Sequence, residues 1–77
     1  MKPLKGTKLK NGTGAIVLAY KVAGYRDSWK NEGWIVLCVI PERGEFATWW
    51  MNSKGETYHG HYTTDLETGL NEFKERS

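Results

Sequence analysis

The sequence predicts an α+β fold, a four-stranded antiparallel β-meander with one C-terminal helix packed on the sheet. Two observations lead to this class. Four apolar segments of strand length are separated by glycine-containing turns, and only the last part of the chain has apolar residues at helical spacing. A small SH3-like barrel that ends in a helix is the alternative. The chain of 77 residues is long enough for one domain. We expect residues 1–12 to form a basic irregular arm and residues 13–77 a single ββββα domain.

The four strand segments differ in their patterns. Residues 14–23 have β-branched and aromatic side chains at a period of two, which is typical of a half-buried strand. Residues 34–40 read WIVLCVI, which is apolar on both faces and predicts a strand covered on both sides. Residues 45–52 and 56–62 are the third and fourth strands. The polar segment 24–33 is a loop between the first two strands.

Both tight turns have glycine at their fourth position, in residues 41–44 (PERG) and 52–55 (NSKG). This position predicts a type I turn followed by a left-handed glycine bulge. Turn geometry fixes the register of a hairpin. We therefore expect Trp50 to pair with Tyr58 in the second hairpin and with Val36 in the first.

Residues 65–75 are predicted to form the helix. Thr64 is the expected N-cap, and Glu67 lies three residues later, as in a capping box. One apolar stripe at i, i+4 and i+7 consists of Leu66, Leu70 and Phe73. The helix is therefore expected to dock on the sheet through this stripe.

One helix covers one face of a sheet, and the predicted sheet has large side chains on both faces. Trp49 and Trp50 are adjacent on one strand, so they point to opposite sides. Strong curling of the sheet, the arm together with the 24–33 loop, or a second copy of the chain would cover the other face. Because soluble monomers rarely expose such a patch, we expect a homodimer. The candidate interaction surface consists of Tyr25, Trp29, Trp49, Trp50, Met51, His59 and His61.

Charge is unevenly distributed along the chain. Residues 1–30 contain seven basic residues and one acidic residue, a net charge of +6, whereas residues 31–77 contain four basic and eight acidic residues, a net charge of −4. The candidate polyanion contact consists of Lys2, Lys5, Lys8 and Lys10. Association of this arm with nucleic acid is one hypothesis, and a solvated N-terminus is the simpler interpretation.

No arrangement of residues indicates catalysis or a cofactor. His59 and His61 lie at i and i+2 of a strand, where both rings would face one ion, but the sequence provides no third ligand. Cys38 lies in an apolar strand, where burial disfavours the thiolate. We expect no catalytic residues, no metal and no cofactor. The predicted function is a non-enzymatic interaction module, and binding of a protein partner is one hypothesis. Alternatives are nucleic-acid association and a small-ligand binder whose aromatic pocket is closed by residues 24–33.

The tail of the chain, residues 48–76, contains TW, then GETYHGHY, DLE and finally FKER. This tail resembles small uncharacterised proteins of bacterial mobile elements, carried on plasmids, phages or gene cassettes. The resemblance implies a bacterial, cytoplasmic protein and transfers no activity. Trp50 and His59 depart from the pattern of that group. No apolar run is long enough to cross a membrane, and the first residues lack the apolar segment of a signal peptide, so no membrane partner is expected.

Overall fold

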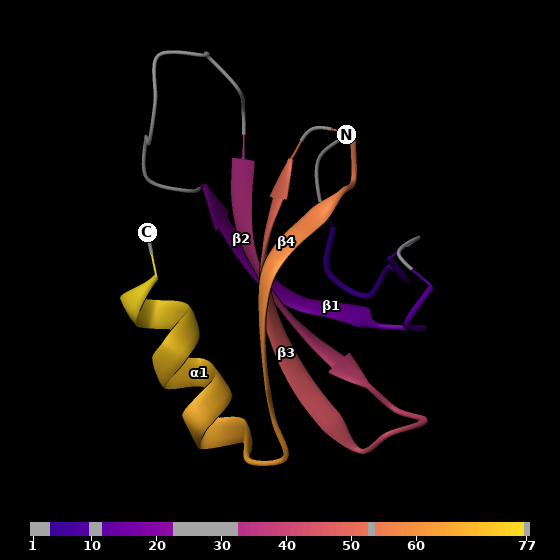
Figure 1. Cartoon of the computed structure of the whole chain (residues 1–77), viewed down its shortest axis with the longest axis vertical. Helices are drawn as coiled ribbons and strands as arrows, with labels where there is room; N and C mark the ends of the chain where they lie inside the picture. Colours follow the sequence, from indigo (N-terminus) through magenta and orange to yellow (C-terminus); the bar gives the residue numbers. More distant parts are fainter. Residues whose placement is uncertain (1–3, 10–11, 23–32, 53, 77) are drawn as a thin grey trace.

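The computed structural model describes residues 4–9, 12–22, 33–52 and 54–76. These residues form one four-stranded antiparallel sheet and one helix, so the predicted α+β class is confirmed (Figure 1). The elements in chain order are β1 (Ile16–Val22), β2 (Gly33–Ile40), β3 (Glu45–Asn52), β4 (Thr57–Thr63) and α1 (Leu66–Glu75). The order in the sheet is β1-β2-β3-β4, which is a meander with β1 and β4 at its edges.

The register between β2 and β3 differs by one residue from the predicted register. The structure pairs Val36 with Trp49, whereas the assumed turn paired Val36 with Trp50. Because side chains alternate across a strand, this difference moves every β3 side chain to the opposite face. Trp49 and Met51 therefore share the face of Val36, and Trp50 lies on the other face.

Proline at the start of the first tight turn explains the difference. In the β3–β4 hairpin, where the predicted register is right at the turn, Asn52 donates its backbone N–H to the carbonyl of Glu56 at 3.0 Å. Pro41 has no N–H, so it cannot take the corresponding place in the β2–β3 hairpin. That turn begins one residue earlier, where Arg43 donates its N–H to the carbonyl of Ile40 at 3.0 Å.

The face that contains Trp49, which we call the core face, is buried within the single chain. Its buried cluster consists of Ala15, Val17, Trp34, Val36, Cys38, Ile40, Ala47, Trp49 and Met51. Leu9 of the arm and Tyr20 of β1 pack against this cluster. The sheet is strongly twisted, and the arm lies across the sheet from α1 (Figure 1). The cluster on this second face is thus buried within one chain with the help of the arm, and the 24–33 loop that was expected to join the arm lies outside the described residues.

α1 covers the opposite face, which we call the helix face. Gly69 is the buried residue of the helix, and a Cβ built on it would lie 3.4 Å from Cδ1 of Leu37. At the far end of the helix, Nζ of Lys21 lies 5.2 Å from the centroid of the Phe73 ring. The helix therefore approaches the sheet closely at its glycine and is held from β1 near its C-terminus.

The helix begins at a different cap from the predicted one. Asp65, rather than Thr64, is the N-cap, because its Oδ2 accepts the backbone N–H of Thr68 at 3.0 Å and the Thr68 hydroxyl at 2.6 Å. The Thr63 hydroxyl in turn accepts the N–H of Asp65 at 3.1 Å. The Thr68 hydroxyl, and after it the Thr68 N–H, lower the pKa of the Asp65 carboxyl.

The described part of the arm, residues 4–9, lies against β1 rather than apart from the domain. Gly6 donates its N–H to the carbonyl of Val17 at 2.7 Å, and Leu9 donates to the carbonyl of Ala15 at 2.8 Å. Within residues 4–9, the bridge to β1 is an isolated one at Lys8. These hydrogen bonds nevertheless make it part of the sheet edge.

Candidate functional site

The structure separates the aromatic residues that the sequence grouped into one interaction surface. Trp49, at 4% exposed, and the buried Met51 belong to the core face. Trp50 is half-buried on the helix face, where a Cβ on Gly33 would overlap its ring. Among the described residues, the exposed aromatic face on which the homodimer was predicted is therefore absent. Tyr25 and Trp29 lie outside the described residues.

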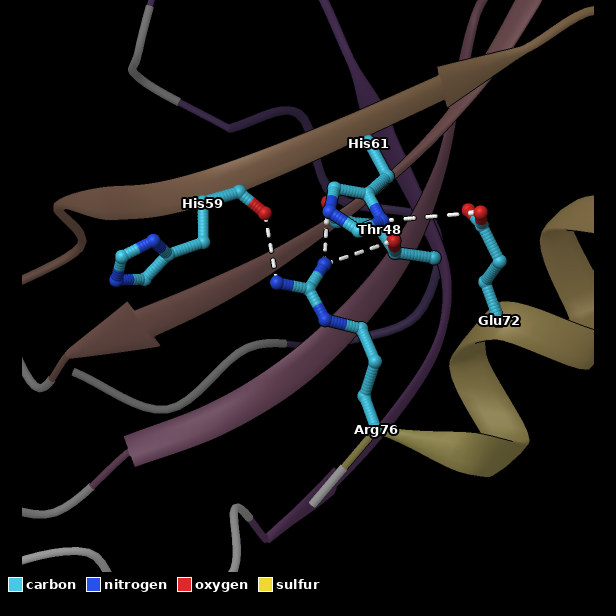
Figure 2. Close-up of polar contacts among 5 residues, drawn as sticks. All are labelled: Thr48, His59, His61, Glu72 and Arg76. Carbon is cyan, nitrogen blue, oxygen red and sulfur yellow. Dashed lines mark hydrogen bonds and ion pairs between the residues drawn. The ribbon is translucent and has the colours of Figure 1, made fainter.

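A β-bulge in β4 separates the two histidines of the predicted surface. His59 has a φ of 56°, and the register with β3 shifts at this point. Glycine is required at position 60, because a Cβ there would lie 2.5 Å from Nε1 of Trp49. Figure 2 shows that the rings of His59 and His61 point in different directions. The i, i+2 spacing therefore does not bring them to one ion, and the described residues contain no group of three or more His, Cys, Asp or Glu side chains that could hold a metal.

Arg76 fills the space beside the bulge (Figure 2). Its Nη1 donates to the carbonyl and to the hydroxyl of Thr48, each at 2.9 Å, and its Nη2 donates to the carbonyl of His59 at 2.6 Å. Beside it, the Glu72 carboxylate lies 3.7 Å from Nδ1 of His61. Burial lowers the pKa of the Arg76 guanidinium, and the nearby Glu72 opposes this effect. Because both terminal nitrogens are used internally, the cluster attaches the end of α1 to the sheet and is not a free anion site.

Two residues outside the predicted surface form an exposed pair on the core-face side, which we call the Arg–Tyr pair: Arg43 and Tyr62. The Tyr62 ring is 49% exposed and packs edge-on against Trp49, with centroids 5.7 Å apart and planes at 87°. Cζ of Arg43 lies 5.8 Å from the centroid of the Tyr62 ring. Nε of Arg43 lies 3.3 Å from Oε1 of Glu45. Gly60 is the feature of the sequence that could have indicated this arrangement. A glycine inside a strand indicates a bulge, and the bulge in β4 places Tyr62 on the core-face side.

Tyr58 is the counterpart of Tyr62 on the helix-face side. It is 43% exposed, and its ring centroid lies 5.8 Å from that of Trp50. Its hydroxyl donates to Oε1 of Glu56 at 2.9 Å, and this hydrogen bond raises the pKa of the Tyr58 phenol. β4 thus presents one exposed tyrosine on each side of the sheet, one beside a guanidinium and the other beside a carboxylate.

Two of the four lysines predicted to contact a polyanion, Lys5 and Lys8, are described and exposed. The other two, Lys2 and Lys10, lie outside the described residues. The arm that carries them packs its Leu9 on the core face. The arm lies across the sheet from α1 (Figure 1), and the bridge of Lys8 to Ile16 places the Lys8 side chain on the face opposite to that of Leu9.

The other side of the sheet is acidic. Residues 65–76, which include α1, contain four acidic and two basic residues, a net charge of −2. The acidic residues are Asp65, Glu67, Glu72 and Glu75. The sheet thus lies between the arm and the acidic helix (Figure 1).

Cys38 is a core residue in the structure. Its side chain is buried, and this burial raises the pKa of the thiol to about 12. A thiol with such a pKa is almost entirely protonated at neutral pH, so Cys38 is poorly suited to act as a nucleophile.

Among the described residues, no helix is long and apolar enough to span a membrane. Comparison with protein-family models, with curated proteins and with solved structures finds no match. The resemblance of residues 48–76 to mobile-element proteins therefore stays a prediction.

Proposed function

We propose that the protein is a non-enzymatic binding module that contacts nucleic acid with the arm side of its sheet. The observation that supports this proposal is the separation of charge across the sheet. The arm that carries Lys5 and Lys8 lies across the sheet from α1 (Figure 1), and Arg43 lies beside Tyr62 on the core-face side, whereas residues 65–76 carry their net negative charge on the helix-face side. A polyanion that approaches the arm side meets the basic groups first and has the sheet between it and the acidic helix.

Self-association is less well supported by the same geometry. The homodimer was expected to hide a second sheet face, and the described apolar cluster on that face is already buried within one chain. Sedimentation at micromolar concentration tests the homodimer separately. A monomer mass is the result that the buried core face favours.

The proposed contact is small, which sets the expected size of its salt dependence. Three phosphate contacts to a duplex, by Lys5, Lys8 and Arg43, give a slope of about −2.7 in a plot of log affinity against log salt. Affinity should then fall about 40-fold between about 50 mM and 200 mM salt. Contacts by Lys2 and Lys10 would steepen the slope.

Fluorescence anisotropy with labelled random-sequence DNA tests the proposal. In the arm variant, Lys5→Gln and Lys8→Gln are combined, and we expect weaker binding and a slope that is shallower by about 1.8 for a duplex. The matched control combines Lys54→Gln with Lys74→Gln, which removes the same net charge from outside the arm. We expect the control to bind nearly as well as the natural chain. No binding at low salt, or an equal loss in both variants, would overturn the proposal.

A further inference from the structure

We infer that the Arg–Tyr pair is a stacking site for an unpaired base, so that the module prefers single-stranded to double-stranded nucleic acid. This inference rests on the proposed nucleic-acid contact and names the form of nucleic acid that the contact selects. It is carried by the packing of Tyr62, by the position of Arg43, and by the contrast with Tyr58.

Tyr62 is a ring that is exposed but held in place. About half of it is accessible, while its other part packs at 87° against Trp49, which is itself almost fully buried. A ring fixed from below loses little conformational freedom when a ligand stacks on it. It therefore presents a preformed apolar surface of the kind on which bases stack.

Arg43 adds a planar cation beside this ring. Its guanidinium lies 5.8 Å from the ring centroid, and its Nε is held by Glu45 at 3.3 Å. Among the described residues, no hydrogen bond of its two terminal nitrogens is found, and the side chain is 55% exposed. Guanidinium groups bind phosphate oxygens in bidentate fashion and stack on flat rings. Arg43 is thus placed to contact the phosphate or the outer face of a base that lies on Tyr62.

The two tyrosines of β4 differ in the charge beside them. Tyr62 lies beside the Arg43 guanidinium, whereas the hydroxyl of Tyr58 donates to the carboxylate of Glu56. A nucleotide on Tyr58 would bring its phosphate near that carboxylate and near the acidic helix side. Tyr62 is therefore the better placed of the two for a nucleotide, and Tyr58 is a matched control with similar exposure.

Strand preference follows from what stacking requires. In a duplex the faces of the bases are covered by neighbouring base pairs, so the ring of Tyr62 has no base face to contact. The duplex then binds only through its phosphates, by the arm lysines and Arg43. A single strand binds through phosphates and through one stacked base, and one base–aromatic stack changes affinity between about 5-fold and 150-fold.

Anisotropy titrations with oligothymidine and with a duplex of the same length test this inference. We expect the natural chain to bind oligothymidine more tightly than duplex. Tyr62→Leu, which keeps an apolar cover on Trp49, should weaken oligothymidine binding by about 5-fold or more and leave duplex binding unchanged. Tyr62→Phe should retain the preference, since stacking does not need the hydroxyl. Tyr58→Leu should bind both probes like the natural chain.

The outcomes separate the inference from the proposal on which it rests. Equal affinity for the two probes, or equal losses from Tyr62→Leu and Tyr58→Leu, would overturn the stacking site while salt-dependent binding through the arm stands. Absence of salt-dependent binding to either probe would overturn both. Arg43→Lys keeps the charge beside Glu45 but loses the planar group, so it should reduce the single-strand preference more than it reduces duplex binding.

Discussion

Replacing Arg76 by methionine should lower the free energy of unfolding by about 2 kcal/mol. Methionine keeps much of the side-chain stem but removes the donors to the carbonyl and hydroxyl of Thr48, which is 0% exposed. A buried polar atom left without its partner costs about 1–3 kcal/mol. The carbonyl of His59, on an exposed residue, can bind water instead, so its loss should add little.

This loss should be large enough to measure in a domain of this size. At about 2.1 cal/mol/K for each of the 77 residues, the unfolding entropy is about 0.16 kcal/mol/K, so the midpoint of thermal unfolding should fall by about 12 °C. Urea unfolding followed by tryptophan fluorescence gives the free energy directly. Lys74→Met removes a neighbouring exposed charge and should stay within about 0.5 kcal/mol of the natural chain.

A double-mutant cycle with Thr48→Val tests the assigned mechanism. Valine removes the hydroxyl of Thr48 at nearly constant volume. If Arg76 acts through that hydroxyl, the two losses should be less than additive, with a coupling of about 0.5–3 kcal/mol. Full additivity, or an Arg76→Met variant that unfolds at the same urea concentration as the natural chain, would refute this account of the C-terminal anchor.

The remaining predictions concern the helix and the arm. Gly69→Ala should stabilise the chain by up to about 1 kcal/mol in urea unfolding, because alanine favours the helix and its Cβ would make ordinary contacts of 3.4 Å and more; destabilisation would show that the sheet cannot accept it. Thr64→Ala should change stability by less than about 0.5 kcal/mol, whereas Asp65→Ala should measurably destabilise; equal effects would contradict the assigned cap. Because hydrogen bonds from Thr68 lower the pKa of folded Asp65, its stabilisation is present above the unfolded pKa of about 3.9 and is lost as pH falls through the folded pKa. Asp65→Asn should therefore flatten the acid side of a stability–pH curve, and an unchanged acid limb would argue against this linkage. Deleting residues 1–10 should lower the thermal midpoint, since the arm hydrogen-bonds to β1; an unchanged midpoint would show that the arm adds nothing.

Much of the fold could be predicted from the sequence because its elements have clear periods. β2 and α1 both lie within one residue of their predicted bounds, although Leu66 of the predicted stripe is exposed. The predicted register of β2 and β3 was wrong because Pro41 lacks one atom, the amide hydrogen. That atom decides where the turn begins, and turn position decides which face each β3 side chain takes. A general glycine rule could not supply this information, although the proline itself was visible in the sequence.

The candidate site was harder to predict because it depends on three-dimensional contacts of residues far apart in the chain. The arm lysines could be named from composition, and the structure describes two of them as exposed. Nothing in the local sequence indicated that Leu9 packs on the core face, which fixes the arm that carries those lysines against the sheet. Arg43 likewise meets Tyr62 only after both the turn and the bulge have formed.

The β4 bulge links the exposed aromatic rings to the protection of the sheet edge. In a regular strand, residues four apart lie on the same face, so Tyr58 and Tyr62 would be neighbours on one side. The bulge places them on opposite sides, against Trp50 and Trp49 respectively. The same bulge interrupts the edge of β4, and Arg76 donates a hydrogen bond to the carbonyl of His59 there. Bulges and edge charges are the features that keep an edge strand from pairing with another chain. β4 is therefore better suited to bind a ligand through the Tyr62 side chain than to extend the sheet through its backbone.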